Sequence, residues 1–149
     1  MQLNLPEITL TTKECSVGNL NVEQALNRIY DHLYANGLHK TPTSILNEVT
    51  KLLKTGIFIE KKTGLKPAFC FGPEEVSELL RHSVKSEKIV SDFRSNFQKM
   101  NKTWAMFDSS EGINLNNADL GYCISQLNRL EFSSDARYLV GYAVEIFRT

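Results

Sequence analysis

The chain has 149 residues, of which 42% are hydrophobic and 23% are charged, and this composition excludes a disordered polymer. Seventeen Lys and Arg balance seventeen Asp and Glu, so the net charge of zero neither requires nor forbids a polyanionic partner. The length fits a single domain over 1–149, with a possible subdivision into 1–72 and 73–149. Since no run reaches the roughly 18 apolar residues of a membrane-spanning helix and no signal peptide is evident, we expect a cytoplasmic protein without a membrane partner.

The three cysteines lie far apart in the sequence, and none belongs to a CxxC pair. This spacing argues against a disulfide framework and fits a reducing cytoplasm. Cys70 stands in the apolar run Ala68-Phe69-Cys70-Phe71, where we expect it to act as a small buried hydrophobic side chain.

The first half of the chain begins with a segment that alternates apolar and polar residues over 3–12, which predicts one or two short edge strands. An apolar stripe at helical spacing then predicts a helix over 22–36. A second helix is predicted over 42–55, because Thr41 can cap its start and Gly56 can end it.

The period of the pattern changes after the second helix. The apolar runs 57–60 and 68–71 predict two strands. The connection 61–67 is rich in turn formers, and Gly64 can adopt a positive φ there. We therefore predict a β-hairpin with a basic tip.

From residue 73 onward the pattern predicts helices only. The apolar series weakens around 83–87, so one long helix and two helices that meet near Ser86 both fit. A turn-rich loop and two amphipathic helices are expected to follow, over 108–114, 117–130 and 134–147. The predicted fold class is mainly α, formally α+β, with about five helices and one small β-hairpin.

Charge is distributed unevenly along the chain, although it sums to zero. Residues 38–66 carry six Lys against two Glu, whereas residues 108–149 carry three Arg against six acidic residues. Such asymmetry favours a nucleic-acid partner for the basic part.

One face of the second predicted helix carries side chains suited to nucleic acid. Thr and Asn can hydrogen-bond base edges or phosphates, and Lys neutralises phosphates. With the hairpin tip they form the predicted nucleic-acid-binding set: Thr43, Asn47, Thr50, Lys51, Lys54, Lys61, Lys62 and Lys66. The same residues would also suit a solvated helix face and a hairpin edge protected from aggregation.

A helix that leads directly into a basic hairpin resembles the recognition helix and wing of a winged helix-turn-helix domain. The resemblance covers about 22–72. It implies a regulatory protein that binds nucleic acid, with DNA favoured over RNA as the partner.

A protein-binding module, such as an adaptor, chaperone or inhibitor, is the alternative function. In a nucleic-acid-binding protein, the helices after residue 90 would form a homodimer interface or a partner platform, because they carry an apolar series at three-four spacing that resembles a coiled-coil seam. Its members are Phe93, Phe97, Met100 and Trp104. The same spacing also suits a helix that packs across a core.

No sequence feature predicts an enzyme. The histidines His32, His39 and His82 lack metal-ligand spacing. The chain also lacks a phosphate-binding Gly-rich loop and a G-x-S-x-G nucleophile motif. We therefore expect no catalytic residue, no cofactor and no metal.

Overall fold

The computed structural model describes residues 22–36, 41–65, 69–130 and 132. Within these ranges the chain forms five α-helices and one turn of 3-10 helix, and it forms no strand. The elements are α2 (Val22–Asn36), α3 (Pro42–Thr63), α4 (Pro73–Leu80), η1 (Val84–Ser86), α5 (Glu87–Trp104) and α6 (Asn117–Gln126). The mainly helical fold class is therefore confirmed, whereas its β part is not found in the described residues.

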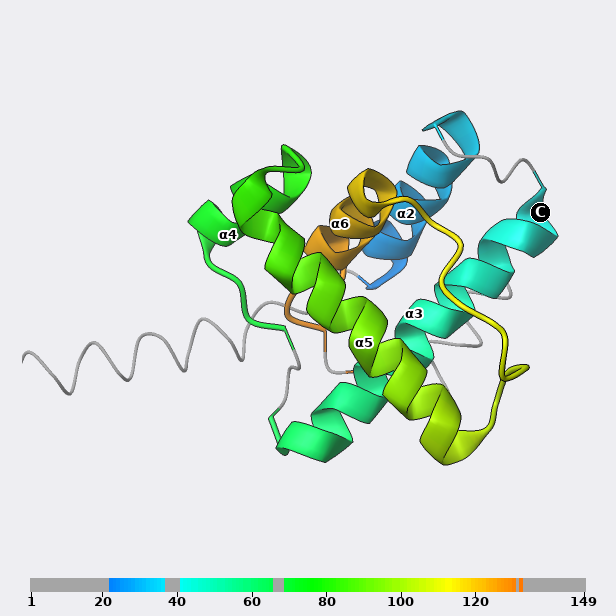
Figure 1. Cartoon of the computed structure of the whole chain (residues 1–149). Coiled ribbons are helices and arrows are strands. Elements are labelled where there is room, and N and C mark those ends of the chain that lie inside the picture. The colour runs from blue at the N-terminus through cyan, green and yellow to red at the C-terminus, as the bar shows by residue number, and fades with distance from the viewer. Residues whose placement is uncertain (1–21, 37–40, 66–68, 131, 133–149) are drawn as a thin grey trace, which may run out of the picture.

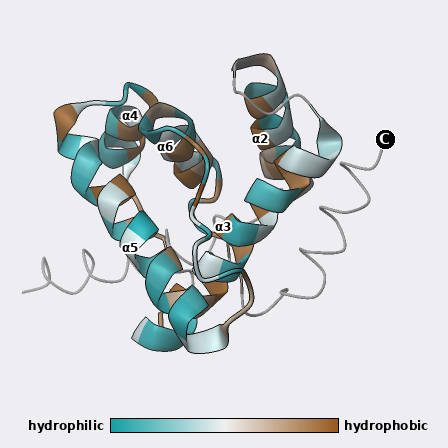
Figure 2. Cartoon of the chain, turned by 45° about the vertical axis from the view of Figure 1, so that its right-hand side comes forward, coloured by the Kyte–Doolittle hydropathy of each residue, from teal (hydrophilic) through white to brown (hydrophobic). Residues whose placement is uncertain are grey.

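The helices pack around one apolar core. Figure 1 shows α5 crossing in front of α3, while α6 lies between α2 and α4 and contacts both. The segment 105–116, which we call the strap, leaves the end of α5 and runs back across α3 to the start of α6 (Figure 1). α5 is largely hydrophilic on the side that Figure 2 turns to the viewer, because its apolar residues face the core.

Helix α3 is longer than its sequence predicts. The helix passes through Gly56 and continues to Thr63, so the predicted strand 57–60 is wrong. Gly56 lies in the helix interior. Glycine suits this position because a Cβ there would approach the ring carbons of Phe132 to 2.8 Å. This glycine therefore makes room for an aromatic ring and does not end the helix.

The end of α3 is set by Gly64. Its φ of 76° is left-handed, and its N–H donates to the carbonyl oxygen of Glu60 at 2.7 Å. A residue with a side chain adopts this backbone only with strain, so glycine suits the position. The predicted positive φ at Gly64 is correct, but it caps a helix and does not turn a hairpin.

The second predicted strand, 68–71, is also wrong in its described part. Residues 69–71 have no regular secondary structure. The side chain of Asn128 accepts a hydrogen bond from the N–H of Phe71 at 2.8 Å and donates to its carbonyl oxygen at 3.0 Å. The N–H of Arg129 donates to the carbonyl oxygen of Phe69 at 2.8 Å. Residues after α6 thus satisfy the backbone groups that a partner strand would have bound.

The remaining boundaries follow the sequence closely. Two helices, α4 and α5, meet near Ser86 through the short η1, which decides between the two alternatives. The loop predicted over 108–114 lies within the strap, and the helix predicted over 117–130 starts as expected but ends at Gln126. The strands predicted within 3–12, the helix predicted over 134–147 and Lys66 lie outside the described residues.

Cys70 differs from its expected role. Its side chain is exposed, whereas its apolar sequence neighbours suggested burial. It is disulfide-bonded, which corrects the expectation of a reduced, buried Cys70, whereas Cys123 is free.

Candidate nucleic-acid interface

Most of the predicted contact residues of α3 share one face, which we call the outer face. At about 100° per residue, they lie within about 60° of one another around the helix axis. The members are Thr43, Asn47, Thr50, Lys54 and Lys61. Thr43, Asn47 and Lys61 are exposed, while Thr50 and Lys54 are half-buried. At 1.5 Å per residue, the outer face extends for about 27 Å from Thr43 to Lys61.

Two side chains on or beside this face make hydrogen bonds within the protein. The hydroxyl of Thr50 donates to the carbonyl oxygen of Leu46 at 2.8 Å, so its donor is used within the helix. Lys62 is exposed at the flank of the outer face and donates to Oδ1 of Asn96 on α5 at 3.1 Å. The hydroxyl oxygen of Thr50 can therefore still accept a hydrogen bond, although its hydrogen is used within the helix.

Lys51 does not belong to the interface, and this prediction is wrong. Its side chain is fully buried at 0% exposure. Its Nζ donates to Oε2 of Glu48 at 2.9 Å, to Oε2 of Glu111 at 2.9 Å and to the carbonyl oxygen of Gly112 at 2.8 Å. A lysine ammonium has three N–H donors, and these three acceptors match them. Lys51 therefore has neither the exposure nor a free donor for a phosphate.

The carboxylates of α3 also point inward. Glu48 and Glu60 are 1% and 2% exposed. Glu48 pairs with Lys51 and accepts the N–H of Asn114 at 2.9 Å, while Glu60 accepts the N–H of Phe132 at 2.7 Å. Since both acids and Lys51 are buried, the charge that α3 exposes is entirely basic. It comes from Lys54, Lys61 and Lys62.

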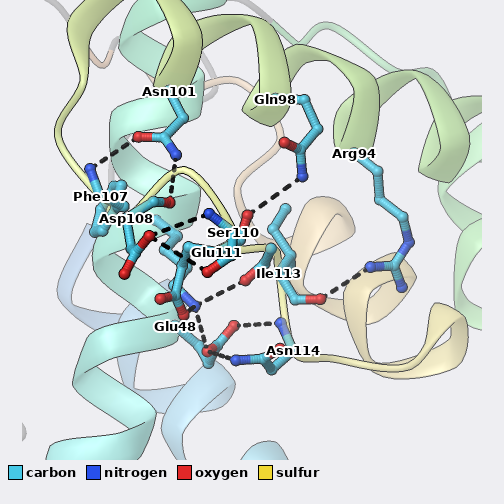
Figure 3. Close-up of polar contacts among 12 residues, drawn as sticks. Glu48, Arg94, Gln98, Asn101, Phe107, Asp108, Ser110, Glu111, Ile113 and Asn114 are labelled. Carbon is cyan, nitrogen blue, oxygen red and sulfur yellow. Dashed lines mark hydrogen bonds and ion pairs between the residues drawn. The ribbon is translucent and has the colours of Figure 1, made fainter.

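The strap is held over α3 by charged side chains from two helices (Figure 3). The guanidinium of Arg94 on α5 donates to the carbonyl oxygens of Ile113 at 3.1 Å and Leu115 at 2.6 Å. Burial lowers the pKa of Arg94, and the neighbouring charge of Glu48 opposes that shift. Asn101 fixes the start of the strap, because it bonds the backbone of the two residues Phe107 and Asp108. This network explains why Lys51 is buried, since the strap covers it.

The residues of the predicted coiled-coil seam lie in the core. Phe93, Phe97 and Met100 are 2%, 0% and 0% exposed, so they cannot form a homodimer interface or a partner platform in this fold. Their three-four spacing arises because α5 packs across α3 and α6. Trp104 differs, since it is half-buried and meets the ring of Phe58 edge to face, with centroids 5.4 Å apart.

A second polar cluster joins α2 to α6. Nε2 of His32 lies 2.9 Å from Oδ1 of Asp119, and the ring of Tyr122 stacks on the imidazole at 4.0 Å. A His–Asp pair can orient a general base, but the neighbouring thiol of Cys123 is buried and its pKa is raised by that burial. The Cys123 thiol is therefore not an activated nucleophile, and the absence of enzymatic activity stays a prediction.

The described ranges contain neither a metal cluster nor a membrane span. There, no group of three or more His, Cys, Asp or Glu side chains could hold a metal ion. No helix in this part of the chain is long and apolar enough to cross a membrane.

The element that would form the wing of a winged helix-turn-helix domain is not found in the described residues. Residues 57–63, which would start the wing, belong to α3, and the described residues contain no strand. The long basic outer face of α3 is what remains of the pattern. No protein-family model, curated protein or solved structure matches the chain.

Proposed function

We propose that the protein binds nucleic acid along the outer face of α3 and acts as a regulatory protein through this binding. The supporting observation is that the charge exposed on α3 is entirely basic, because Glu48 and Glu60 are buried. Lys54, Lys61 and Lys62 would contact phosphates, since an ammonium group neutralises a phosphate and releases its counterions. The three lysines lie toward one end of the face.

The polar residues at the other end of the face would contact bases or sugars. Thr43 and Asn47 are exposed within the first two turns of α3, and both offer hydrogen-bonding groups. The buried Lys51 has no part in this arrangement. With three lysines as the phosphate contacts, duplex binding should fall with salt at a logarithmic slope of about −2.7.

Binding to labelled DNA across a salt series tests the proposal. The test variant is Lys54→Gln, Lys61→Gln and Lys62→Gln together. The matched control replaces three exposed lysines outside α3, namely Lys85, Lys88 and Lys102, by Gln. Both variants have the same net charge, so a difference between them reports the place of the lysines.

We expect the α3 variant to lose at least about tenfold in affinity and most of its salt dependence. The control should bind within about threefold of the wild type, because none of its three lysines belongs to α3. Absence of binding by the wild type at about 50 mM salt would overturn the proposal. An equal loss in both variants would also overturn it, because bulk charge alone would then explain binding.

A protein-binding module is the second candidate function. Its supporting observation is the corner between α4 and α5, where Leu80 and Val84 are 51% and 80% exposed. These exposed apolar side chains, four residues apart in the chain, suit a protein partner or a second copy of the chain. Sedimentation equilibrium of the wild type and of Val84→Asp tests self-association: a dimer that the substitution dissociates would support it, and a monomeric wild type would contradict it.

A further inference from the structure

An aromatic pair lies beside the basic part of the outer face. Phe58 lies on α3 one turn after Lys54 and one turn before Lys61 and Lys62. Its ring is half-buried, and it meets Trp104 of α5 with their planes at 86°. Aromatic surface thus stands between cationic side chains over about 10 Å of helix.

This combination suits single strands better than duplexes. In a duplex the bases stack on one another, so their flat faces are closed to a protein side chain. In a single strand those faces are open, and stacking on an aromatic ring stabilises binding while lysines hold the backbone. In an edge-to-face pair, the contact covers neither face of the ring that presents its edge, so the pairing itself leaves that ring free to accept a stacked base.

We propose that the nucleic acid bound by α3 is single-stranded, with a base stacked on the Phe58–Trp104 pair. Lys54 contacts a phosphate on one side of that base, and Lys61 and Lys62 contact phosphates on the other side. The inference rests on the proposed nucleic-acid binding by α3. It adds a requirement that duplex binding would not have, namely the aromatic ring between the lysines.

Both rings also pack against the core, so a structural role has to be separated from stacking. Trp104 is the sole tryptophan of the chain, and its fluorescence therefore reports on this site alone. The full-length protein is titrated with a thymidine single strand of about ten nucleotides, which spans one binding site, and with a duplex of the same length. Phe58→Leu keeps an apolar side chain but removes the ring, and Phe71→Leu is the control at another half-buried phenylalanine outside α3.

We expect the single strand to quench Trp104 fluorescence and to bind at least about fivefold more tightly than the duplex. Phe58→Leu should weaken single-strand binding by about 5- to 150-fold, the value of one stacked base, while it changes duplex binding little. Phe71→Leu should leave both affinities unchanged. Circular dichroism confirms that the variants fold.

The outcomes separate this inference from the proposed function. Lysine-dependent duplex binding without a change in Trp104 fluorescence, and without preference for the single strand, would overturn the inference alone. Unchanged single-strand affinity in Phe58→Leu would do the same. If neither strand form bound in a salt-dependent way, both the inference and the proposed function would be wrong.

Discussion

The two faces of α3 use charged residues in opposite ways. On the inner side and its rim, Glu48, Lys51 and Glu60 are buried and hydrogen-bonded. On the outer face and its flank, the lysines are exposed or half-buried, and the structure assigns them far fewer contacts. A count of the charges on α3 does not distinguish these groups, although only the lysines of the outer face and its flank can contact an external anion.

The difference in burial decides whether a charged residue of α3 affects folding stability or ligand binding. A buried ammonium is very costly to desolvate, so it persists only where its donors find acceptors, as those of Lys51 do with Glu48, Glu111 and Gly112. An exposed lysine contributes little to folding because water solvates it. The inner charges should therefore control stability, and the outer ones should control binding.

Removal of the buried ammonium should have the largest effect on stability. Lys51→Met keeps an apolar stem of similar length but leaves Glu48 and Glu111 without their cation. We expect the free energy of unfolding to fall by about 3–5 kcal/mol, the usual cost of breaking a buried ion pair. Urea denaturation followed by circular dichroism measures it.

The matched substitution on the outer face is Lys54→Met, one turn further along α3. It should change the unfolding free energy by less than about 1 kcal/mol, because it breaks no buried ion pair. Equal losses in Lys51→Met and Lys54→Met would contradict the division of α3 into two faces.

The packing of the inner face gives a second test. Glycine to alanine inside a helix normally stabilises it by up to about 1 kcal/mol. At Gly56 the new Cβ would lie 2.8 Å from the ring of Phe132, which is itself fully buried. We expect Gly56→Ala to destabilise the protein by about 1–3 kcal/mol in thermal or urea unfolding, as overpacking does.

Asn47→Ala on the outer face is the control for this test. There the gain in helix propensity meets no packing cost, so stability should rise by a few tenths of a kcal/mol. A second variant, Gly56→Ala with Phe132→Leu, should recover part of the loss that Gly56→Ala causes. If Gly56→Ala stabilised the protein as Asn47→Ala does, the close contact with Phe132 would be refuted.

Elements set by local rules could be predicted from the sequence. Thr41 caps α3 as expected, since its hydroxyl accepts the N–H of Ser44 at 3.2 Å. The bounds of α2, the break between α4 and α5 near Ser86, and the start of α6 also follow from local patterns. In each case the deciding residues are neighbours in the chain.

Features set by distant contacts could not be predicted in this way. Gly56 has the appearance of a helix stop, but its role depends on Phe132, far along the chain. Lys51 fits the outer face by spacing, yet the strap covers it through Glu111 and Gly112. The seam residues of α5 likewise could not be assigned to core or surface, because periodicity alone does not say what a helix packs against.

The last prediction extends the comparison to a buried group that has no counterion. Nζ of Lys51 bonds the carboxylates of Glu48 and Glu111, whereas the Cys123 thiol has no such partner charge among the described residues, and burial raises its pKa and keeps it neutral. Below about pH 8.5 the thiol is protonated in both the folded and the unfolded chain, so it has no effect. Above that value the unfolded chain releases the proton first, and the free energy of unfolding should fall by about 1.4 kcal/mol per pH unit.

Cys123→Ala removes the thiol and, with it, this dependence of the unfolding free energy on pH. Urea denaturation between about pH 7.5 and 10 should therefore show a steeper loss of stability in the wild type than in the variant, and the two curves should approach each other as the pH rises. Burial also raises the pKa of Tyr122, but that group titrates in both proteins, so the difference between the curves reports mainly on the thiol. Parallel curves would mean that the Cys123 thiol ionises as easily in the folded protein as in the unfolded chain. That outcome would contradict the rule that a buried ionisable group of this fold is either paired, as Lys51 is, or neutral.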